Sequence, residues 1–587
     1  KENTWAYDYL YGVELNPDLA LATKVNMVLH GDGSGNIFAK DALLPFEKYE
    51  NKIKVSILAK SKLIQNYYDK ELNEQFDFVI SNPPFSIKLD NDTKRLLPKT
   101  FIYAEMGNSE NLFIERWYQL LKEGGKLGVV LPESIFDTGE NQYIRMFLFK
   151  YFKILNVISL PSGKDGAFQP YTLIKTSLLF AKKKTKAEVK EWEKEWRESS
   201  NKYAKLRRKI NLIIKSKEDS EENREVIKIY LKSYFSEEDS ELTVPELLEK
   251  HNEDIKEIDK NKDWWVFSEV SKKFDYEIFI AHAKNLGYHR TKNREFKREN
   301  ELFSFDDEFY VSYNLKNPET ILDFIRTKKK INEPDRFYIN FSDIANSISL
   351  RLDHRFYRYK IFEEPLILSN YKKKPILLRE VILDIRNGKD VQRESYSVDA
   401  NGSTIETDYK YITVNNIKEE GFVIDEVINL MVKTGEKLSK FKLEKNEIII
   451  TRSGTVGISK VFDIDEEETI FIPSGYLIIV KVDESKINPE FLEFFLNSKI
   501  MKKYFDVFGT GKTQKNISQR DIKRIPIPSL NLEEQNEITS FYRKKKEKIF
   551  KLISEKTQEI KKLNEELGEV IPSKVLKKKL EIKFEEE

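Results

Sequence analysis

Apolar and polar positions along residues 1–185 alternate in a way that predicts an α/β domain. Short apolar runs bounded by turn residues are typical of buried strands, and apolar residues three or four positions apart are typical of helices. The stretch 111–122 has this helical spacing and ends at Gly124-Gly125, a common helix stop. We expect a doubly wound, Rossmann-like parallel sheet with strands at 11–15, 37–41, 76–81, 126–131, 154–159 and 176–180.

Residues 186–262 are dense in Lys and Glu and predict a charged helical insertion. Trp192 and Trp196 are spaced to share one face of its first helix. The insertion is interpreted either as a set of solvent-facing helices or as an arm that docks a partner.

The rest of the chain divides into three regions. Residues 263–345 have globular composition and are expected to hold the end of the first domain and a connector. Residues 346–530 are rich in short β-branched runs, which predict a mixed α+β domain. Residues 531–587 predict a long C-terminal helix with apolar residues on a heptad seam at 549, 553, 560, 563 and 567.

Composition narrows the class of protein. The 587 residues include no cysteine, which excludes a disulfide scaffold and thiolate metal sites. No apolar stretch is long enough to span a membrane, so we expect a cytoplasmic protein. The five histidines show no metal-ligand spacing, and no metal is expected. The net charge is only +2 although 34% of residues are charged, so any nucleic-acid surface must be local.

Asn82-Pro83-Pro84-Phe85 directly follows the expected strand 76–81. Two prolines cannot continue a strand ladder, which puts this loop at the sheet edge where open α/β folds bind ligands. The prolines also restrict the backbone that carries Asn82. The motif resembles the catalytic loop of DNA adenine methyltransferases. This resemblance implies acceptors that bind both N–H groups of an adenine amine and free its delocalised lone pair, with Phe85 stacked on the base. An ordinary strand followed by a Pro-Pro turn is the alternative.

Two acidic residues end the preceding strands. Glu14 closes the strand at 11–15, where a carboxylate can bind the two hydroxyls of a ribose. Asp41 closes the strand at 37–41, where it could accept a hydrogen bond from the amine of a bound adenine ring. Taken singly, either residue could equally start a helix or a turn. Their order along the chain, ahead of Asn82, favours a nucleoside-binding edge.

Residues 1–185 therefore resemble the modification subunit of type I restriction-modification systems and its single-chain type IIG relatives. These are S-adenosylmethionine-dependent DNA adenine-N6 methyltransferases. The resemblance is carried by Tyr11-Gly-Val-Glu-Leu-Asn-Pro17, Asn26-Met-Val-Leu-His-Gly31, Asp41-Ala-Leu43, Ser81 to Phe85, Asn108-Ser-Glu-Asn-Leu-Phe113, Gly124-Gly-Lys-Leu-Gly-Val-Val-Leu-Pro132, Leu160-Pro-Ser-Gly163, Phe168-Gln-Pro-Tyr171 and Ile174-Lys-Thr176.

This resemblance implies roles for the loop at Asn82 and for two aromatic residues further along the chain. Asn82 would bind the target amine, with the Pro83 carbonyl as the second acceptor, inside a catalytic loop completed by Pro84 and Phe85. The target adenine must leave the duplex stack, and Phe85 would hold one face of it. Phe168 or Tyr171 would hold the other face, and the resemblance leaves both open.

The resemblance also implies S-adenosylmethionine as the cofactor. Glu14 would hold its ribose and Asp41 its adenine, and Ala42 and Asn82 would also belong to the cofactor-binding site. The family places a Gly-rich loop before the ribose-binding acid, and residues 1–13 contain none. We therefore expect that loop in a separate or upstream segment.

Residues 348–567 resemble one copy of the type I specificity subunit. The matching motifs are Arg351-Leu-Asp-His-Arg-Phe-Tyr357, Glu447-Ile-Ile-Ile-Thr-Arg-Ser-Gly-Thr-Val-Gly457, Gly509-Thr-Gly-Lys-Thr-Gln-Lys-Asn-Ile-Ser518 and Ile525-Pro-Ile-Pro-Ser-Leu-Asn-Leu-Glu-Glu-Gln535. A target-recognition domain for double-stranded DNA is implied. Four cations beside glycines or small residues are the candidate backbone contacts, namely Arg452, Lys512, Lys515 and Arg520.

The expected function is site-specific adenine methylation in a restriction-modification or phage-defence system, as a monomer or a homodimer. One alternative is a non-catalytic recognition and assembly subunit. Another is a part of a larger restriction enzyme whose nuclease domain lies upstream, since residues 1–587 show no nuclease constellation of carboxylates and lysine.

Overall fold

The computed structural model divides into two compact units, which are Lys1–Glu364 with Thr510–Thr513, and Pro365–Gly509 with Gln514–Glu587. It describes residues 4–31, 36–43, 74–85, 87, 89, 91–97, 101–105, 108–291, 294–308, 310–371, 373–398, 404–418, 421–423, 427–464, 468–511 and 515–570. Within these ranges, no helix combines the length and the hydropathy that crossing a membrane requires.

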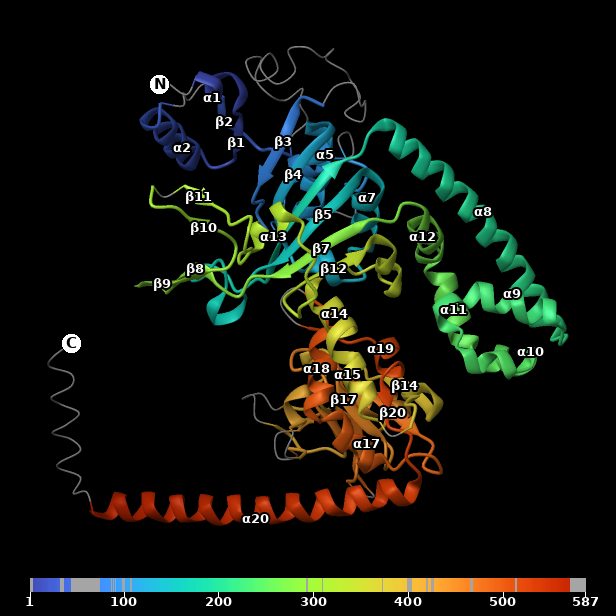
Figure 1. The fold of residues 1–587 in the computed structure, drawn as a ribbon. Coiled ribbons are helices and arrows are strands. Elements are labelled where there is room, and N and C mark those ends of the chain that lie inside the picture. Colours follow the sequence, from blue (N-terminus) through green and yellow to red (C-terminus); the bar gives the residue numbers. More distant parts are fainter. Residues whose placement is uncertain are drawn as a thin grey trace. The chain divides into compact units, whose positions relative to one another are not determined.

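A six-stranded sheet forms the centre of the first unit, in the order β12-β7-β5-β6-β4-β3 (Figure 1). Its strands are β3 (Phe76–Ser81), β4 (Leu121–Pro132), β5 (Phe152–Ser159), β6 (Thr176–Lys183), β7 (Glu277–His282) and β12 (Arg336–Asn340). Strands β3 and β4 are parallel, as are β5 and β7. Strand β6 is antiparallel to both of its neighbours, and β12 is antiparallel to β7.

The sheet is therefore mixed, and the expected all-parallel arrangement is not what the structure contains. The difference begins at residues 160–175, which join β5 to β6 and hold only a 3-10 turn, Gly163–Asp165. A parallel crossover normally needs a helix to return the chain to the opposite edge. Because this connection has none, β6 starts at the edge where β5 ends. The expected connector also contributes to the sheet, through β12.

Strands β1 (Gly12–Glu14) and β2 (Ile37–Ala39) form a separate parallel pair joined by helix α2 (Pro17–Leu29). Asn16 caps α2 by accepting hydrogen bonds from two backbone N–H groups of its first turn, and Pro17 occupies the first helical position. The ring of Tyr11, just before β1, meets the ring of Phe76 at the start of β3, with centroids 5.4 Å apart.

Helices α5 (Ser109–Leu120) and α7 (Gln142–Tyr151) pack beside the sheet, and α6 (Ser134–Asp137) follows β4. Helix α5 buries polar residues as well as apolar ones, including Glu115, whose carboxylate accepts hydrogen bonds from the N–H groups of Ile102 and Tyr103 at 2.8 and 3.0 Å. The smaller elements of this unit are α1 (Thr4–Tyr9), α4 (Asn91–Leu96), β8 (Leu286–Arg290), β9 (Glu295–Asn300), β10 (Ser304–Phe305), β11 (Val311–Ser312), α13 (Ile321–Thr327) and α14 (His354–Arg358).

Five helices after β6 form what we call the helical arm, visible in green in Figure 1. They are α8 (Lys186–Ser216), α9 (Glu221–Leu231), α10 (Val244–Lys250), α11 (Asn252–Lys260) and α12 (Lys262–Lys273). Thr185 starts α8 with a capping box that includes Glu188. The arm has a core of its own, because Trp192, Tyr203 and Ile210 of α8 are buried.

The second unit contains a four-stranded sheet, β14-β20-β17-β18, a three-stranded sheet, β16-β15-β19, and the pair β13-β21. A core of apolar residues fills it, including Ile449, Phe471 and Ile479. Its strands are β13 (Ile376–Leu377), β14 (Ile382–Asn387), β15 (Tyr409–Ile412), β16 (Ile428–Asn429), β17 (Ile448–Thr451), β18 (Ser459–Val461), β19 (Ile470–Pro473), β20 (Leu477–Val482) and β21 (Pro526–Ile527).

The helices of the second unit are α15 (Glu364–Ser369), α16 (Val432–Leu438), α17 (Pro489–Leu496), α18 (Lys499–Phe508), α19 (Gln519–Lys523) and α20 (Leu532–Val570). Helix α20 packs on α17 near its start, where the Gln535 side chain accepts a hydrogen bond from the N–H group of Asn488 at 2.8 Å. Further along α20, Ile549, Ile560 and Leu563 of the heptad seam are more than half exposed.

Candidate active site

The carboxyl ends of β3, β4 and β5 lie at one edge of the central sheet, because these strands run in the same direction. Asn82 follows β3 and Glu133 follows β4. Strand β6 begins at the same edge, so residues 160–175 also lie there. The fold thus brings together segments that are far apart in the sequence.

The loop from Asn82 to Phe85 lies at this edge of the sheet, and its candidate catalytic side chain, Asn82, is exposed. Pro83 is buried, whereas Asn82 is exposed and Phe85 is half-buried. The ring of Phe85 lies against the ring of Phe168, with centroids 6.3 Å apart and planes at 81°. Tyr171, the other candidate for stacking, is 84% exposed. The structure therefore brings Phe168, and not Tyr171, to Phe85.

Backbone hydrogen bonds hold Phe168 in place within a compact loop. The N–H group of Ala167 donates to Pro161 O at 3.2 Å, and the N–H group of Thr172 donates to Phe168 O at 3.2 Å. The Gln169 side chain donates to the carbonyl of Gly163 at 2.8 Å. A planar base between Phe85 and Phe168 needs van der Waals contact on both faces, so the rings must turn parallel and separate to roughly 7 Å.

Glu14 and Asp41 close the neighbouring strands β1 and β2. The N–H group of Lys40 donates to Glu14 O at 3.0 Å, which keeps the two strand ends adjacent. The Glu14 carboxylate accepts from the N–H group of Asn16 at 2.8 Å. The Asp41 carboxylate accepts from the N–H group of Leu43 at 2.8 Å, in a turn that also contains half-buried Ala42. Acidic acceptors at adjacent strand ends fit the hydroxyl and amine donors of a nucleoside.

A buried polar network behind the same edge was not predicted from the sequence. Ser177 donates to the Glu133 carboxylate at 2.6 Å, and Lys175 lies 3.5 Å from its other oxygen. Arg355 pairs with Asp137 at 3.1 Å. The network joins the residues after β4 to the residues before and within β6.

Burial raises the pKa of Asp137 to about 7, and the nearby Asp353 carboxylate adds to the shift. Arg351 and Arg355 oppose it with their positive charges. Arg145, fully buried on α7, donates to the carbonyls of three separate residues at 2.6 to 2.7 Å, namely Ile135, Thr138 and Ser349. The sequence signal for this network was weak, because isolated charges beside strands usually indicate surface positions.

The motif from Arg351 to Tyr357, expected to open the recognition domain at residue 346, lies in the first unit. Arg351 and Asp353 form a buried two-point ion pair at 2.6 and 2.8 Å. The N–H group of Leu352 donates to Phe136 O at 2.9 Å. These contacts attach the motif to the segment after β4, and the division between units falls at Glu364 instead.

The candidate DNA contacts of the second unit cluster only in part. The bridge between Ser453 and Asn516 brings Arg452 and Lys515 to neighbouring backbone positions. Lys515 forms an ion pair with Asp506, and Arg520 lies 3.5 Å from Asp521. Lys512 lies outside the described residues.

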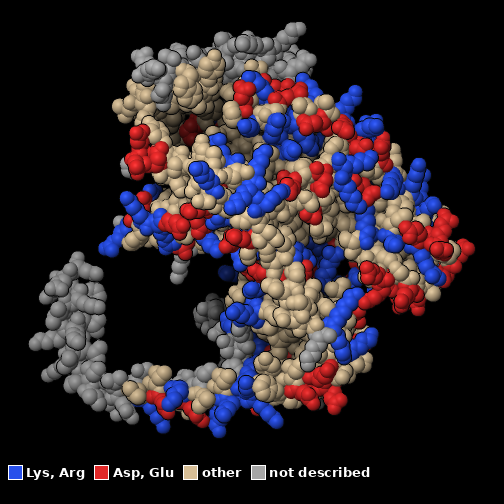
Figure 2. All heavy atoms as spheres, viewed as in Figure 1, with Lys and Arg blue, Asp and Glu red and all other residues tan. Residues whose placement is uncertain are grey.

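The turn beside this cluster needs glycine at one position. Gly457 has φ +92°, and a Cβ atom there would overlap the ring of Phe505. On the face shown in Figure 2, positive and negative side chains are interspersed, so charge density alone marks no DNA-binding surface there.

Comparisons with known proteins match both units. Residues 2–256 match the N-6 DNA Methylase family, and residues 390–562 match the Type I restriction modification DNA specificity domain. The type I restriction enzyme EcoEI methylase subunit of Escherichia coli is 28% identical over 174 residues, which is 29% of this chain and 30% of that protein. The type II restriction enzyme and methyltransferase RM.Eco57I of Escherichia coli is 33% identical over 144 residues, which is 22% of this chain and 14% of that protein.

Among solved structures, the type IIG restriction endonuclease BpuSI aligns with 81% of this chain and 50% of its own, at 12% identity and a TM-score of 0.31. The chain covers less than a third of the length of either curated relative. The family matches confirm the resemblance inferred from the motifs. This protein thus combines a region that matches the N-6 DNA Methylase family with a region that matches the Type I restriction modification DNA specificity domain. It is similar in part to a type I methylase subunit and to a type II restriction enzyme and methyltransferase.

Proposed function

We propose that this protein is a site-specific DNA adenine-N6 methyltransferase of a restriction-modification or phage-defence system. Its first unit would methylate an adenine extruded from duplex DNA, and its second unit would select the sequence. The contact between Phe85 and Phe168 beside exposed Asn82 is the observation that carries this proposal. It joins a hydrogen-bonding group to a pair of aromatic rings at the edge where α/β sheets bind ligands.

Asn82 would act on the adenine amine directly. Its side-chain oxygen and the Pro83 carbonyl would accept the two N–H hydrogens, which draws the nitrogen toward tetrahedral geometry and localises its lone pair. Phe85 and Phe168 would hold the base by stacking and thereby offset part of the unstacking cost of a few kcal/mol. No covalent enzyme intermediate is needed, because the methyl carbon would pass directly to the amine nitrogen as its bond to the sulfonium sulfur breaks. The sulfur would leave as a neutral thioether, and the amine would then lose its surplus proton.

Glu14 and Asp41 are the groups that would hold the methyl donor. Glu14 would accept hydrogen bonds from ribose hydroxyls, and Asp41, in the turn with Ala42, would accept one from the adenine amine. S-adenosylmethionine, when bound, supplies an activated methyl group. Calorimetric titration of the complete natural protein with S-adenosylmethionine tests this role, and Glu14→Ala should weaken binding at least tenfold.

The protein would bind DNA through Arg452, Lys515 and Arg520 of the second unit, together with Lys512. One recognition domain would read a short or asymmetric site in a monomer, and a bipartite site in a homodimer. Neutralising a cation that contacts phosphate should weaken binding to all sequences alike and reduce its salt dependence.

Substituting Asn82 tests the catalytic assignment. Asn82→Ala removes the side-chain acceptor, so we expect methyl transfer to fall below detection while DNA affinity stays within a few-fold of wild type. Transfer of a labelled methyl group to duplex DNA and a gel-shift titration measure the two properties. The matched control is Asn252→Ala, at an exposed asparagine that starts α11. Methylation that survives in Asn82→Ala would contradict the catalytic role assigned to Asn82, whereas DNA binding without methyl transfer by the wild-type protein would favour the alternative of a non-catalytic recognition subunit.

A further inference from the structure

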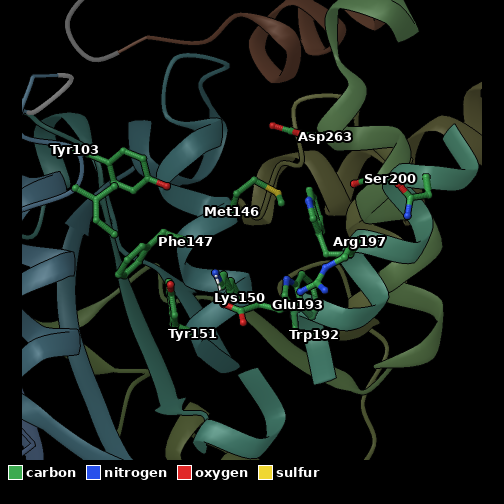
Figure 3. A pocket seen from close by; sticks show the side chains of 13 residues that line it. Tyr103, Met146, Phe147, Lys150, Tyr151, Trp192, Glu193, Arg197, Ser200 and Asp263 are labelled. Carbon is green, nitrogen blue, oxygen red and sulfur yellow. Dashed lines mark ion pairs between the residues drawn. The ribbon is translucent and has the colours of Figure 1, made fainter. Parts of the chain in front are cut away.

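A cavity of about 620 Å³ lies between α7, which packs beside the central sheet, and α8 of the helical arm (Figure 3). Strand β5 begins directly after α7, so the residues at the end of α7 lie at the amino end of the strand. Asn82 follows the carboxyl end of β3, which runs in the same direction as β5. The cavity is therefore near the opposite edge of the sheet from the candidate active site.

Aromatic rings from three segments line this cavity. Tyr103 comes from the segment before α5, Phe147 and Tyr151 from α7, and Trp192 and Trp196 from α8. The two tryptophan rings are stacked, with centroids 6.2 Å apart and planes at 19°. The aromatic side chains on the α7 side lie opposite the α8 residues in Figure 3. Phe147 and Trp192 are almost wholly buried, so the partly exposed rings are Tyr103 and Tyr151 on the α7 side and Trp196 on the α8 side.

The walls are held in place before any ligand binds. The N–H group of Tyr103 donates to the buried Glu115 carboxylate, which fixes the backbone of that wall. Lys150 of α7 pairs with Glu193 of α8 at 2.8 Å and so joins the two sides. A preformed cavity loses less conformational freedom on binding than one that must be assembled.

Polar groups in the cavity add charge selectivity to the aromatic walls. Arg197 points into the space beside Glu193 in Figure 3, and it makes no ion pair or hydrogen bond with any residue that the structure describes. A guanidinium binds phosphate oxygens in a two-point geometry. Glu193 and Asp263 line the same cavity and can accept hydrogen bonds from amine or hydroxyl donors.

We propose that this cavity binds a purine nucleoside monophosphate. Its base stacks on the aromatic walls, its amine or ribose hydroxyls donate to the carboxylates, and its phosphate binds Arg197. The cavity volume lies within the usual range for small-molecule sites, about 300–1,000 Å³. This second site is independent of the proposed methyl transfer and suits an effector that acts on the joint between the sheet and the helical arm.

Adenosine monophosphate is the probe that tests this site. Because Trp192 and Trp196 line the cavity, binding should quench tryptophan fluorescence saturably, and Trp196→Phe should remove most of the signal. We expect Arg197→Gln to weaken binding at least tenfold. The matched control, Arg208→Gln, changes an exposed arginine on the same helix and should stay within twofold. Circular dichroism verifies that each variant is folded.

Two further probes separate the parts of the ligand. Adenosine should bind at least fivefold more weakly than adenosine monophosphate, and inorganic phosphate alone should not quench. No saturable change up to about 5 mM, which is several times a Kd of about 1 mM, would overturn the proposal. Equal affinity in wild type and Arg197→Gln would also overturn it, as would binding that Asn82→Ala abolishes and Arg197→Gln leaves unchanged, since that locates the nucleotide at the other edge.

Discussion

His251, at the junction of α10 and α11, is fully buried between two carboxylates. Its ring nitrogens lie 2.7 Å from Asp254 and 3.1 Å from Asp239. Asp239 is also 2.7 Å from Lys250. Burial opposes the ionisation of Asp239, but the hydrogen bonds from Lys250 and the Ser236 backbone outweigh it and lower its pKa to about 2.

Asp239→Asn tests how much this residue holds the helical arm together. Removing one partner from a buried ionic cluster typically costs about 3–5 kcal/mol, and we expect a loss of that order in the free energy of unfolding at pH 7. Because the pKa of Asp239 is lower in the folded protein than the usual 3.8, its contribution is full above about pH 4 and is lost as pH falls toward 2.

The difference in the free energy of unfolding between wild type and Asp239→Asn should therefore be smaller at pH 3 than at pH 7, as measured by urea denaturation. Glu249→Gln, at an exposed acidic residue on α10, is the control and should change stability by less than about 0.5 kcal/mol. A deficit of equal size at both pH values would contradict the role assigned to Asp239.

Single residues also show where sequence reasoning reached its limit. The strand-and-turn pattern placed Asn82 and Phe85 after a strand, and β3 ends directly before them. It did not distinguish Phe168 from Tyr171, because that choice depends on how the loop folds back through hydrogen bonds between distant backbone groups. The burial of Asp137 and Arg145 was not predicted, because a charged side chain is normally expected to be exposed and the sequence does not show its buried partners.

At the scale of elements, Arg145 ties α7 to two other segments. It donates to carbonyls in and just after α6 and to Ser349. Arg145→Met would leave these carbonyls without that donor, at about 1–3 kcal/mol for each group left unsatisfied. We expect the first unit to lose roughly 3 kcal/mol or more.

Denaturation of Arg145→Met should be followed with separate probes, since two units need not unfold together. The transition of the first unit should move to lower urea concentration, while that of the second unit should stay in place. The matched control is Arg208→Met, which changes an exposed arginine on α8 and should leave both transitions in place. A variant with wild-type transitions would show that Arg145 does not hold these segments.

Strand direction was the weakest part of the prediction at this scale. Strands β3 to β6 lie within two residues of the expected starts, apart from β4, which begins earlier. Apolar runs identify strands but carry no information on direction. Direction follows from the connection, and the short helix-free link between β5 and β6 determines the antiparallel pairing.

At the scale of the molecule, the boundary between units can be tested with fragments. Residues 365–587 should unfold in one cooperative transition, because the sheets and the helix α17 that supports α20 lie within this range. A fragment of residues 346–587 should gain no stability, since it carries Ser349, Leu352 and Arg355 without the groups that they contact in the first unit. Those groups belong to Arg145, Phe136 and Asp137. Thermal unfolding by circular dichroism compares the two.

If only the longer fragment folds, the motif at Arg351 belongs to the second unit, as its sequence resemblance first indicated. The motifs identified both family resemblances, which the family matches confirm. The motifs could not locate the boundary between the units, because residues 351–357 would match the family whichever unit they pack against.

The buried ion pair of Arg351 and Asp353 affects where recombination could exchange the second unit. Both residues of this ion pair come before Glu364, so a recombination event at Pro365 would exchange residues 365–587. The described side-chain partners of Arg145, Asp137 and Asp353 would stay together in the first unit. A lineage could in this way replace the region that matches the specificity domain in a single genetic step and leave the buried charges of the first unit paired. The boundary at which the second unit can be exchanged therefore lies after the Arg351–Tyr357 motif, although that motif resembles the specificity subunit.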